Sequence, residues 1–273
     1  MTEKEKRPVS NAEKKAQAFL RLNAIVAALR APDGCPWDRE QTSYSLAPAF
    51  LEEAHELIDA LEAGDPKEIR EEDGDILLHG VMQAYLFEEQ GLFDVADVLN
   101  DISDKLVRRH PHVFGTLHVK DSEEVMKNWE AIKKEEKSAE RKSVLDGLSN
   151  TLPALAAAAE IQRKAAKQNF DWTEIEPVFD KCEEEFKELK EARSENNKDH
   201  IEEEFGDLLF ALVNLSRFMD VNAEQALRRA NRKFIARFKK MEELLQKDGL
   251  AMRDQDLATL DRYWEKVKAS EKE

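Results

Sequence analysis

Two short acidic motifs carry the residue types best suited to chemistry. Glu185 and Glu188 lie three residues apart, and Glu204 and Asp207 repeat that spacing just before a long apolar run. Residues three apart on a helix share a face, so each motif would hold two carboxylates at the edge of a buried surface. If the two helices pack antiparallel, four carboxylates converge. Like charges that close are tolerable only with a cation between them.

The chain carries this arrangement twice. Each of the four acids has an acidic counterpart 132 positions earlier, at Glu53, Glu56, Glu72 and Asp75. A repeat this long indicates two copies of a whole domain rather than a solenoid of short units. Further pairs are repeated at helical spacing: Lys105 and Arg109 match Lys233 and Arg237, and Trp129 and Lys133 match Trp264 and Lys268.

The composition favours long helices and excludes some partners. The 273 residues are 41% hydrophobic and 37% charged, with only 9 Gly and 8 Pro. A formal charge of −16 argues against a general nucleic-acid binder, which needs basic surface. Two cysteines give no disulfide framework, and neither a signal peptide nor a run of about 20 apolar residues is present. We expect a cytoplasmic protein that does not enter a membrane.

Hydrophobic periodicity predicts an all-α fold built from tandem, duplicated helical-bundle domains. The predicted domains are residues 1–136 and 151–273, with a charged linker at 137–150. A short helix should hold Trp129. The other expected helices cover residues 12–30, 44–61, 67–90, 94–109, 154–167, 175–192, 200–219, 223–245 and 257–268.

Two breaks between the expected helices leave alternatives open: one contains Trp37, and the other contains His110 and His112. Trp37 falls in a segment, 33–38, that we expect to be irregular; it could stack on a flat ligand or close the loop as a core residue. His110 and His112 flank a proline. Because the spaced partners of a typical metal site are missing, we expect them to pack a loop rather than to bind metal.

The acidic residues suit metal-assisted phosphate chemistry. Ligands that are all carboxylates favour a hard cation, so Mg²⁺ is expected, with Mn²⁺ as a substitute. Lys233 and Arg237 could neutralise polyphosphate oxygens, Trp264 offers a stacking surface, and Lys268 adds a cation unless it serves only solubility. These parts suggest attack of water on a nucleotide phosphate, with Glu184 as a candidate general base.

Several motifs together resemble the all-α nucleoside triphosphate pyrophosphohydrolases, and among them the two-domain bacterial MazG group. These motifs are Cys35-Pro36-Trp37-Asp38, Leu51-Glu52-Glu53-Ala54-His55-Glu56, Arg108-Arg109-His110-Pro111-His112-Val113-Phe114, Glu184-Glu185 with Glu188, and Phe205-Gly206-Asp207-Leu208-Leu209-Phe210. The resemblance extends over residues 22–268.

This resemblance implies a Mg²⁺-dependent enzyme that clears nucleotides from the pool. Such enzymes cleave NTPs or dNTPs between the α and β phosphates, releasing a monophosphate and pyrophosphate. They form intertwined homodimers, and in the MazG group the C-terminal domain is credited with the activity. Carried onto this chain, the metal ligands are Glu185, Glu188, Glu204 and Asp207, and the nucleotide contacts are Lys233, Arg237 and Trp264, with Lys181 and Lys268 as further candidates. His200 departs from the family, which can place a lysine there.

The two halves should not be equivalent. Asn214 faces the same way as Glu204 and Asp207, but its counterpart is Met82, which cannot coordinate a hard cation. His79 likewise replaces Ala211 beside the acids. We therefore predict a weak or silent N-terminal site, whose helices mainly support the dimer.

Three other functions compete with this interpretation. One is a pyrophosphatase of narrow specificity, for example for dCTP or dUTP, because base selectivity depends on pocket shape. Another is a ferritin-like di-metal bundle, which would need Glu-x-x-His motifs that neither acidic pair has. The last is a non-catalytic protein whose acidic helices bind a basic partner.

Overall fold

The computed structural model describes residues 10–137 and 142–271, apart from the side chains of residues 134, 135 and 137. The chain divides into two compact units, Met1–Ser138 and Ala139–Glu273. Within the described ranges every regular element is helical, and each unit contains a hairpin of two long helices, α3 with α4 and α9 with α10. The prediction of an all-α fold with a tandem repeat is therefore confirmed.

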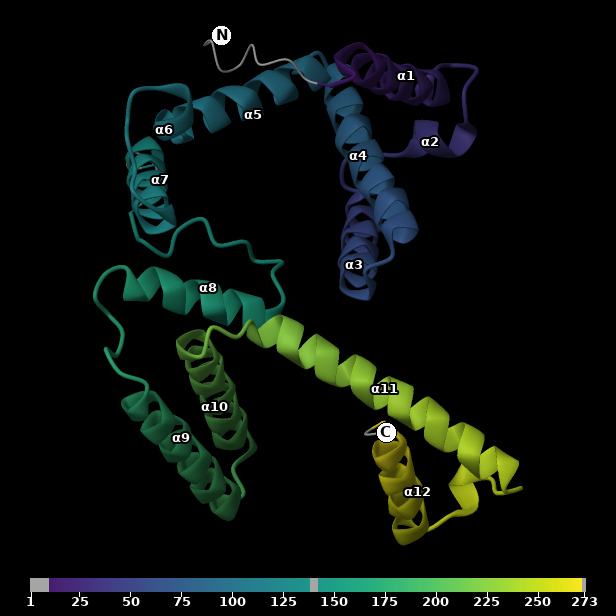
Figure 1. Cartoon of the computed structure of the whole chain (residues 1–273), viewed down its shortest axis with the longest axis vertical. Coiled ribbons are helices and arrows are strands. Elements are labelled where there is room, and N and C mark those ends of the chain that lie inside the picture. Colours follow the sequence, from purple (N-terminus) through teal and green to yellow (C-terminus); the bar gives the residue numbers. More distant parts are fainter. Residues whose placement is uncertain (1–9, 138–141, 272–273) are drawn as a thin grey trace. The chain divides into compact units, whose positions relative to one another are not determined.

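The first unit contains seven helices among its described residues. They are α1 (Ala12–Arg30), α2 (Pro36–Glu40), α3 (Ala47–Ala63), α4 (Pro66–Glu88), α5 (Val95–Arg109), α6 (Pro111–Phe114) and α7 (Ser122–Lys137). Helices α3 and α4 form a hairpin (Figure 1), and α1 packs against α4. Val26, Leu46, Val81, Met82 and Leu86 form the buried core where these elements meet.

The second unit repeats this plan with five α-helices and a 3-10 turn among its described residues. They are α8 (Ala154–Ala166), α9 (Glu176–Glu195), α10 (Lys198–Phe218), α11 (Ala223–Lys247), the 3-10 turn η1 (Met252–Asp254) and α12 (Leu257–Ser270). Helices α9 and α10 form the hairpin, α8 packs on both α10 and α11, and α12 lies along α11 (Figure 1). Met241, Leu245, Tyr263 and Val267 bury the contact between α11 and α12.

Both hairpins depend on a tight turn encoded by the sequence. Helix α3 ends at Gly64, whose φ of 74° is left-handed, and the Asp65 side chain caps α4 by accepting from the Lys67 amide. Helix α9 ends at Asn196 with φ 55°, and the Asn197 side chain caps α10. Gly and Asn tolerate the left-handed conformation, and Asp and Asn are good N-caps. At both turns the chain therefore reverses direction within two residues.

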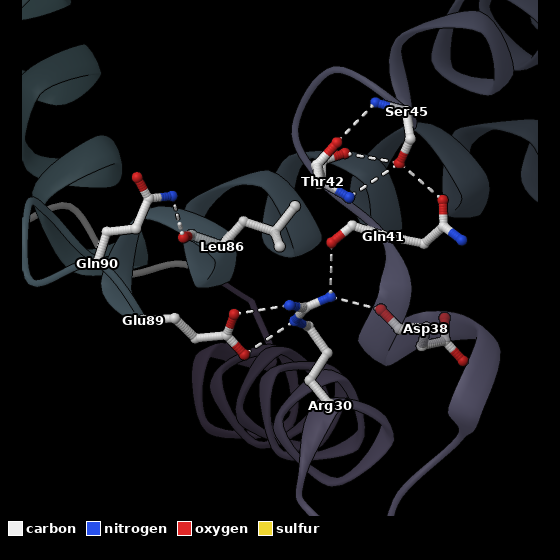
Figure 2. A network of polar contacts seen from close by, with 8 residues as sticks. All are labelled: Arg30, Asp38, Gln41, Thr42, Ser45, Leu86, Glu89 and Gln90. Atoms are coloured by element: carbon white, nitrogen blue, oxygen red, sulfur yellow. Dashed lines mark hydrogen bonds and ion pairs between the residues drawn. The ribbon is translucent and has the colours of Figure 1, made fainter.

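A buried arginine ties the first unit together. The Arg30 guanidinium donates to both Glu89 carboxylate oxygens, at 2.9 and 2.7 Å, and to the main-chain carbonyls of Asp38 and Gln41 (Figure 2). These contacts join the end of α1 to α2 and to the residue that follows α4. Bidentate charge-assisted bonds of this kind are among the stronger polar contacts in proteins.

Two expectations about irregular segments are wrong. Pro36–Glu40 forms the short helix α2, because proline is well placed in the first turn of a helix, and Trp37 on it is 63% exposed rather than a core residue. Pro111 likewise begins α6, so the break at His110 is a single residue. Of the predicted linker, residues 138–141 lie outside the described part. Among the helices that are described, none has the length and apolar character needed to span a bilayer.

Candidate functional site

Three of the predicted acids of the second unit converge. Glu185 and Glu188 on α9 and Glu204 on α10 each offer a carboxylate oxygen, and these oxygens lie within 4.8 Å of one another. Glu185 is only 6% exposed, and Glu188 and Glu204 are half-buried. Burial and the charges of Glu185, Glu184 and Glu204 raise the pKa of Glu188. Such a site is electrostatically costly until a cation enters, and its all-oxygen donors fit a hard divalent ion.

Asp207, the fourth predicted ligand, follows Glu204 on α10 at an exposed position. It is not among the residues that the structure groups within 4.8 Å. It is therefore available at the edge of the site rather than part of the tight cluster.

Two basic side chains, Lys181 and His200, flank the acids. Lys181 lies 3.0 Å from Glu184 and 2.8 Å from Glu185, and its hydrogen bonds to these carboxylates, first to Glu185, raise the lysine pKa. The His200 ring lies 2.9 Å from Glu195 and 3.1 Å from Glu204, and the bond to Glu195 does most to raise the pKa of His200. Lys181, predicted as a nucleotide contact, and Glu184, predicted as a base, thus pair with each other here.

The first unit holds a similar cluster. Glu53, Glu56 and Glu72 offer oxygens within 4.8 Å of one another. Burial and neighbouring carboxylates raise the pKa of Glu53 and of Glu72, and Asp75 contributes to both. The hairpin therefore assembles the acids in both copies, as the repeat predicts, and Asp75 again stands beside the group.

The surroundings of the two clusters differ as their sequences do. Met82 is a core residue, 5% exposed, and the buried His79 packs edge-on against Phe50 at 5.7 Å. In the second unit the buried Asn214 accepts a hydrogen bond from Nη1 of Arg217. Nη2 of the same arginine lies 2.6 Å from Oδ2 of Asp171. The Arg217 and Asp171 contacts were not foreseen, since no local spacing links two residues 46 positions apart.

Apart from Lys181 on α9, the predicted nucleotide contacts of the second unit lie on α11 and α12. Lys233 is exposed, and Arg237 pairs with Glu271 at 2.8 Å. The Trp264 ring lies 5.1 Å from that of Phe234, and Lys268 pairs with Glu265 at 2.6 Å. The acids lie on a different helix pair, α9 and α10, so the acids and these contacts occupy separate pairs of helices within the unit.

Their counterparts in the first unit are more enclosed. Lys105 is exposed, but the Arg109 side chain is 8% exposed and lies over the Trp129 ring, 5.4 Å from its centroid. Lys133 approaches the same ring at 5.0 Å. The tryptophan face that the repeat suggests for stacking is therefore contacted by the protein's own cations.

A cavity of about 400 Å³ lies elsewhere in the second unit. It is lined by residues of α8, the end of α10 and the start of α11, including Arg163, Arg217 and Asn222. None of the predicted site residues lines it. The acidic cluster therefore lies outside this cavity.

Comparison with known families gives a direct match. The model of the MazG nucleotide pyrophosphohydrolase domain matches residues 41–114 and again residues 174–241. These two matches contain both acidic clusters and, in the second unit, Lys233 and Arg237.

Curated relatives match over nearly the whole chain. A Thermotoga maritima protein named nucleoside triphosphate pyrophosphohydrolase/pyrophosphatase MazG is 47% identical over 254 residues, covering 93% of this chain and 96% of the relative. An Escherichia coli K12 nucleoside triphosphate pyrophosphohydrolase is 45% identical over 255 residues, covering 92% and 97%. A Mycobacterium tuberculosis protein of that name is 39% identical over 134 residues, covering 48% and 40%.

Proposed function

The chain belongs to the MazG nucleotide pyrophosphohydrolase family, and from that premise we propose which residues carry its activity. The protein is a nucleoside triphosphate pyrophosphohydrolase: it hydrolyses NTPs to a nucleoside monophosphate and pyrophosphate. We assign the reaction to the second unit, with Glu185, Glu188, Glu204 and Asp207 as the metal ligands. We place this activity in the cytoplasm, where nucleotide pools are held.

The observation that carries this assignment is the convergence of three carboxylates from two helices. Their oxygens lie within 4.8 Å of one another, and the pKa of Glu188 is raised by the acids around it. We assign Mg²⁺ to this cluster, with Mn²⁺ as a substitute, because the donors are all carboxylate oxygens. When bound, the ion would neutralise phosphate charge and polarise the bond to be broken. Asp207 is exposed next to the cluster and is proposed to complete the ligand set.

The surrounding side chains divide the remaining tasks. Glu184 is 55% exposed and paired with Lys181, and we propose that it accepts the proton of the attacking water. Lys181 would then keep Glu184 oriented and could reach a phosphate oxygen itself. Lys233, Arg237 and Lys268 would bind the triphosphate, and Trp264 would stack on the base.

We further propose that the enzyme acts as a homodimer. The acids lie on α9 and α10, whereas Lys233, Arg237, Trp264 and Lys268 lie on α11 and α12, so a second copy could bring α11 and α12 of one protomer against α9 and α10 of the other. Support comes from large apolar side chains that these helices leave open to solvent, which monomeric proteins rarely collect in this number. They include Phe186 (49% exposed), Phe205 (53%), Leu209 (41%), Phe210 (42%), Phe234 (55%) and Ile235 (52%).

The first unit is proposed to be weak or silent. Its acids converge as well, but Met82 replaces Asn214 and His79 replaces Ala211 beside them. The Arg109 side chain is only 8% exposed and lies over the Trp129 ring, whereas that of Arg237 is 21% exposed. Its helices would then mainly support the dimer.

Phosphorus NMR of an ATP incubation with Mg²⁺ tests the bond assignment. We expect AMP and pyrophosphate signals, and their loss when EDTA is added. Orthophosphate with ADP as the products would contradict the proposal. Repeating the assay on four NTPs and four dNTPs would measure the base and sugar preference directly.

A further inference from the structure

An ion pair joins the two helices that carry the proposed nucleotide contacts. Arg237 on α11 donates from Nε to Oε2 of Glu271 at 2.9 Å, and its Nη2 lies 2.8 Å from the same oxygen. Glu271 follows the last residue of α12. Its other carboxylate oxygen, Oε1, lies 3.7 Å from Nζ of Lys240. The Glu271 carboxylate therefore pairs with two positively charged side chains of α11, Arg237 and Lys240.

The same pair is present in the first unit. Arg109 donates from Nε and Nη2 to Oε2 of Glu136, at 3.0 and 2.6 Å, and Oε1 of Glu136 accepts from a second cation, Arg108. Glu136 precedes Glu271 by 135 positions, the spacing that also relates Trp129 to Trp264. Each copy thus holds its repeated arginine with a glutamate from the last helix, through the same guanidinium atoms and the same carboxylate oxygen.

Glu271 binds one edge of the Arg237 guanidinium and leaves the edge that contains Nη1 outside the ion pair. A guanidinium presents its N–H donors in a planar fork, and Glu271 occupies the edge formed by Nε and Nη2. Nη1 takes part in neither contact with Glu271. Phosphate oxygens commonly bind arginine through two parallel N–H groups. An arginine anchored by its side edge can present its end edge to a phosphate without first ordering its long side chain.

The charges around the pair still favour an anion. Arg237 and Lys240 carry two positive charges against the single negative charge of Glu271, so the local sum remains positive. The hydrogen bond from Arg237 also lowers the pKa of Glu271 below its usual value. An ion pair of this exposure contributes little to folding, so its main effect should fall on where the guanidinium points.

We propose that Glu271 is a positioning residue that orients the Arg237 guanidinium toward the triphosphate. The proposal rests on the assignment of Arg237 as a triphosphate contact. Glu271 touches neither substrate nor metal in this account, so its removal should weaken nucleotide binding while leaving the chemical step unchanged.

The test compares four full-length variants, Glu271→Ala, Glu271→Gln, Glu136→Ala and Arg237→Ala. Each is measured for KM and kcat with ATP and Mg²⁺, for the Kd of α,β-methylene-ATP, and for thermal midpoint. We expect Glu271→Ala to raise KM and Kd by about tenfold, roughly one strong contact, at unchanged kcat. Glu271→Gln, which keeps an acceptor oxygen for Arg237, should fall between it and the wild type.

Glu136→Ala is the matched control, because it removes the same ion pair from the other unit. It should leave KM and Kd unchanged, and the thermal midpoints of both variants measure how far each ion pair stabilises its own unit. A lower KM in Glu271→Ala would mean that Glu271 competes with the phosphates, and an unchanged KM would mean that it does not orient Arg237. Either result overturns the proposal.

Arg237→Ala separates this inference from its premise. If Arg237→Ala leaves Kd unchanged, the assignment of Arg237 fails and the role of Glu271 fails with it. If Arg237→Ala weakens binding but both Glu271 variants bind as the wild type does, only the positioning role is wrong. A fifth variant combines Arg237→Ala with Glu271→Ala, and in it the loss of Glu271 should add nothing to the effect of losing Arg237 on Kd.

Discussion

Glu188 on α9 and Glu204 on α10 bring carboxylate oxygens within 4.8 Å of each other across a helical hairpin. The two-residue turn at Asn196 and Asn197 makes this approach possible, because it sends α10 back along α9. The charge of Glu204 is one cause of the raised pKa of Glu188, so these neighbouring carboxylates repel each other. Relief of that repulsion by a bound cation underlies the first prediction.

Mg²⁺ should stabilise the wild-type protein against heat. A ligand that binds only the folded state at a hundredfold excess over its Kd adds about 2.7 kcal/mol of stability. Glu204→Gln should lose most of this gain, because it removes one of the three clustered carboxylates. Glu203→Gln, which removes the same charge from an exposed neighbouring position on α10, should keep it. Equal Mg²⁺ shifts in the two variants would contradict the assignment of Glu204.

Acid should weaken the first unit through Glu136. Hydrogen bonds from Arg109 and Arg108 lower the pKa of Glu136 from 4.5 to about 2. Because this pKa is lower in the folded state, the stabilisation is complete above the ordinary value and is lost as pH falls from 4.5 toward 2. Thermal melts of the wild type and of Glu136→Gln should therefore differ at pH 7 and approach each other at pH 3. If the two thermal midpoints differ by the same amount at pH 7 and at pH 3, the ionised Glu136 carboxylate does not stabilise the fold.

Dimerisation should depend on the apolar face of α10. We expect the wild type to have about twice the 31.4 kDa mass of one chain by light scattering. Phe205→Ser combined with Leu209→Ser should reduce the mass to that of a monomer, since both side chains are exposed in the single chain. Phe170→Ser is the control and should keep the dimer mass, because Phe170 is 82% exposed but lies on the loop between α8 and α9 rather than on α10. A monomeric wild type would refute the dimer.

The acidic clusters could be predicted because their determinants are local. Two i, i+3 pairs, a turn rich in Asn or Gly, and apolar residues on one face are enough to specify a hairpin with acids at its edge. The duplication strengthened this prediction, since positions such as Glu56 and Glu188 keep their register in both copies. The longer helices were predicted to within a few residues for the same reason.

Contacts made by long side chains between separate elements could not be predicted in this way. Arg217 reaches Asp171 across 46 positions, and Glu271 reaches Arg237 across 34. Such pairs depend on how helices pack, which no local periodicity encodes. The repeat did contain a signal for one of them, because Glu136 and Glu271 share the spacing of the two tryptophans, but glutamates near the ends of helices are too common to single out.

The central claim is that turnover belongs to the acids of the second unit. Its most direct test measures pyrophosphate release from ATP by Glu188→Ala and by Glu56→Ala, which remove equivalent carboxylates from the two clusters. We predict that Glu188→Ala abolishes turnover, while Glu56→Ala retains most of the wild-type rate. An active Glu188→Ala with an inactive Glu56→Ala would place the reaction in the first unit and contradict this account.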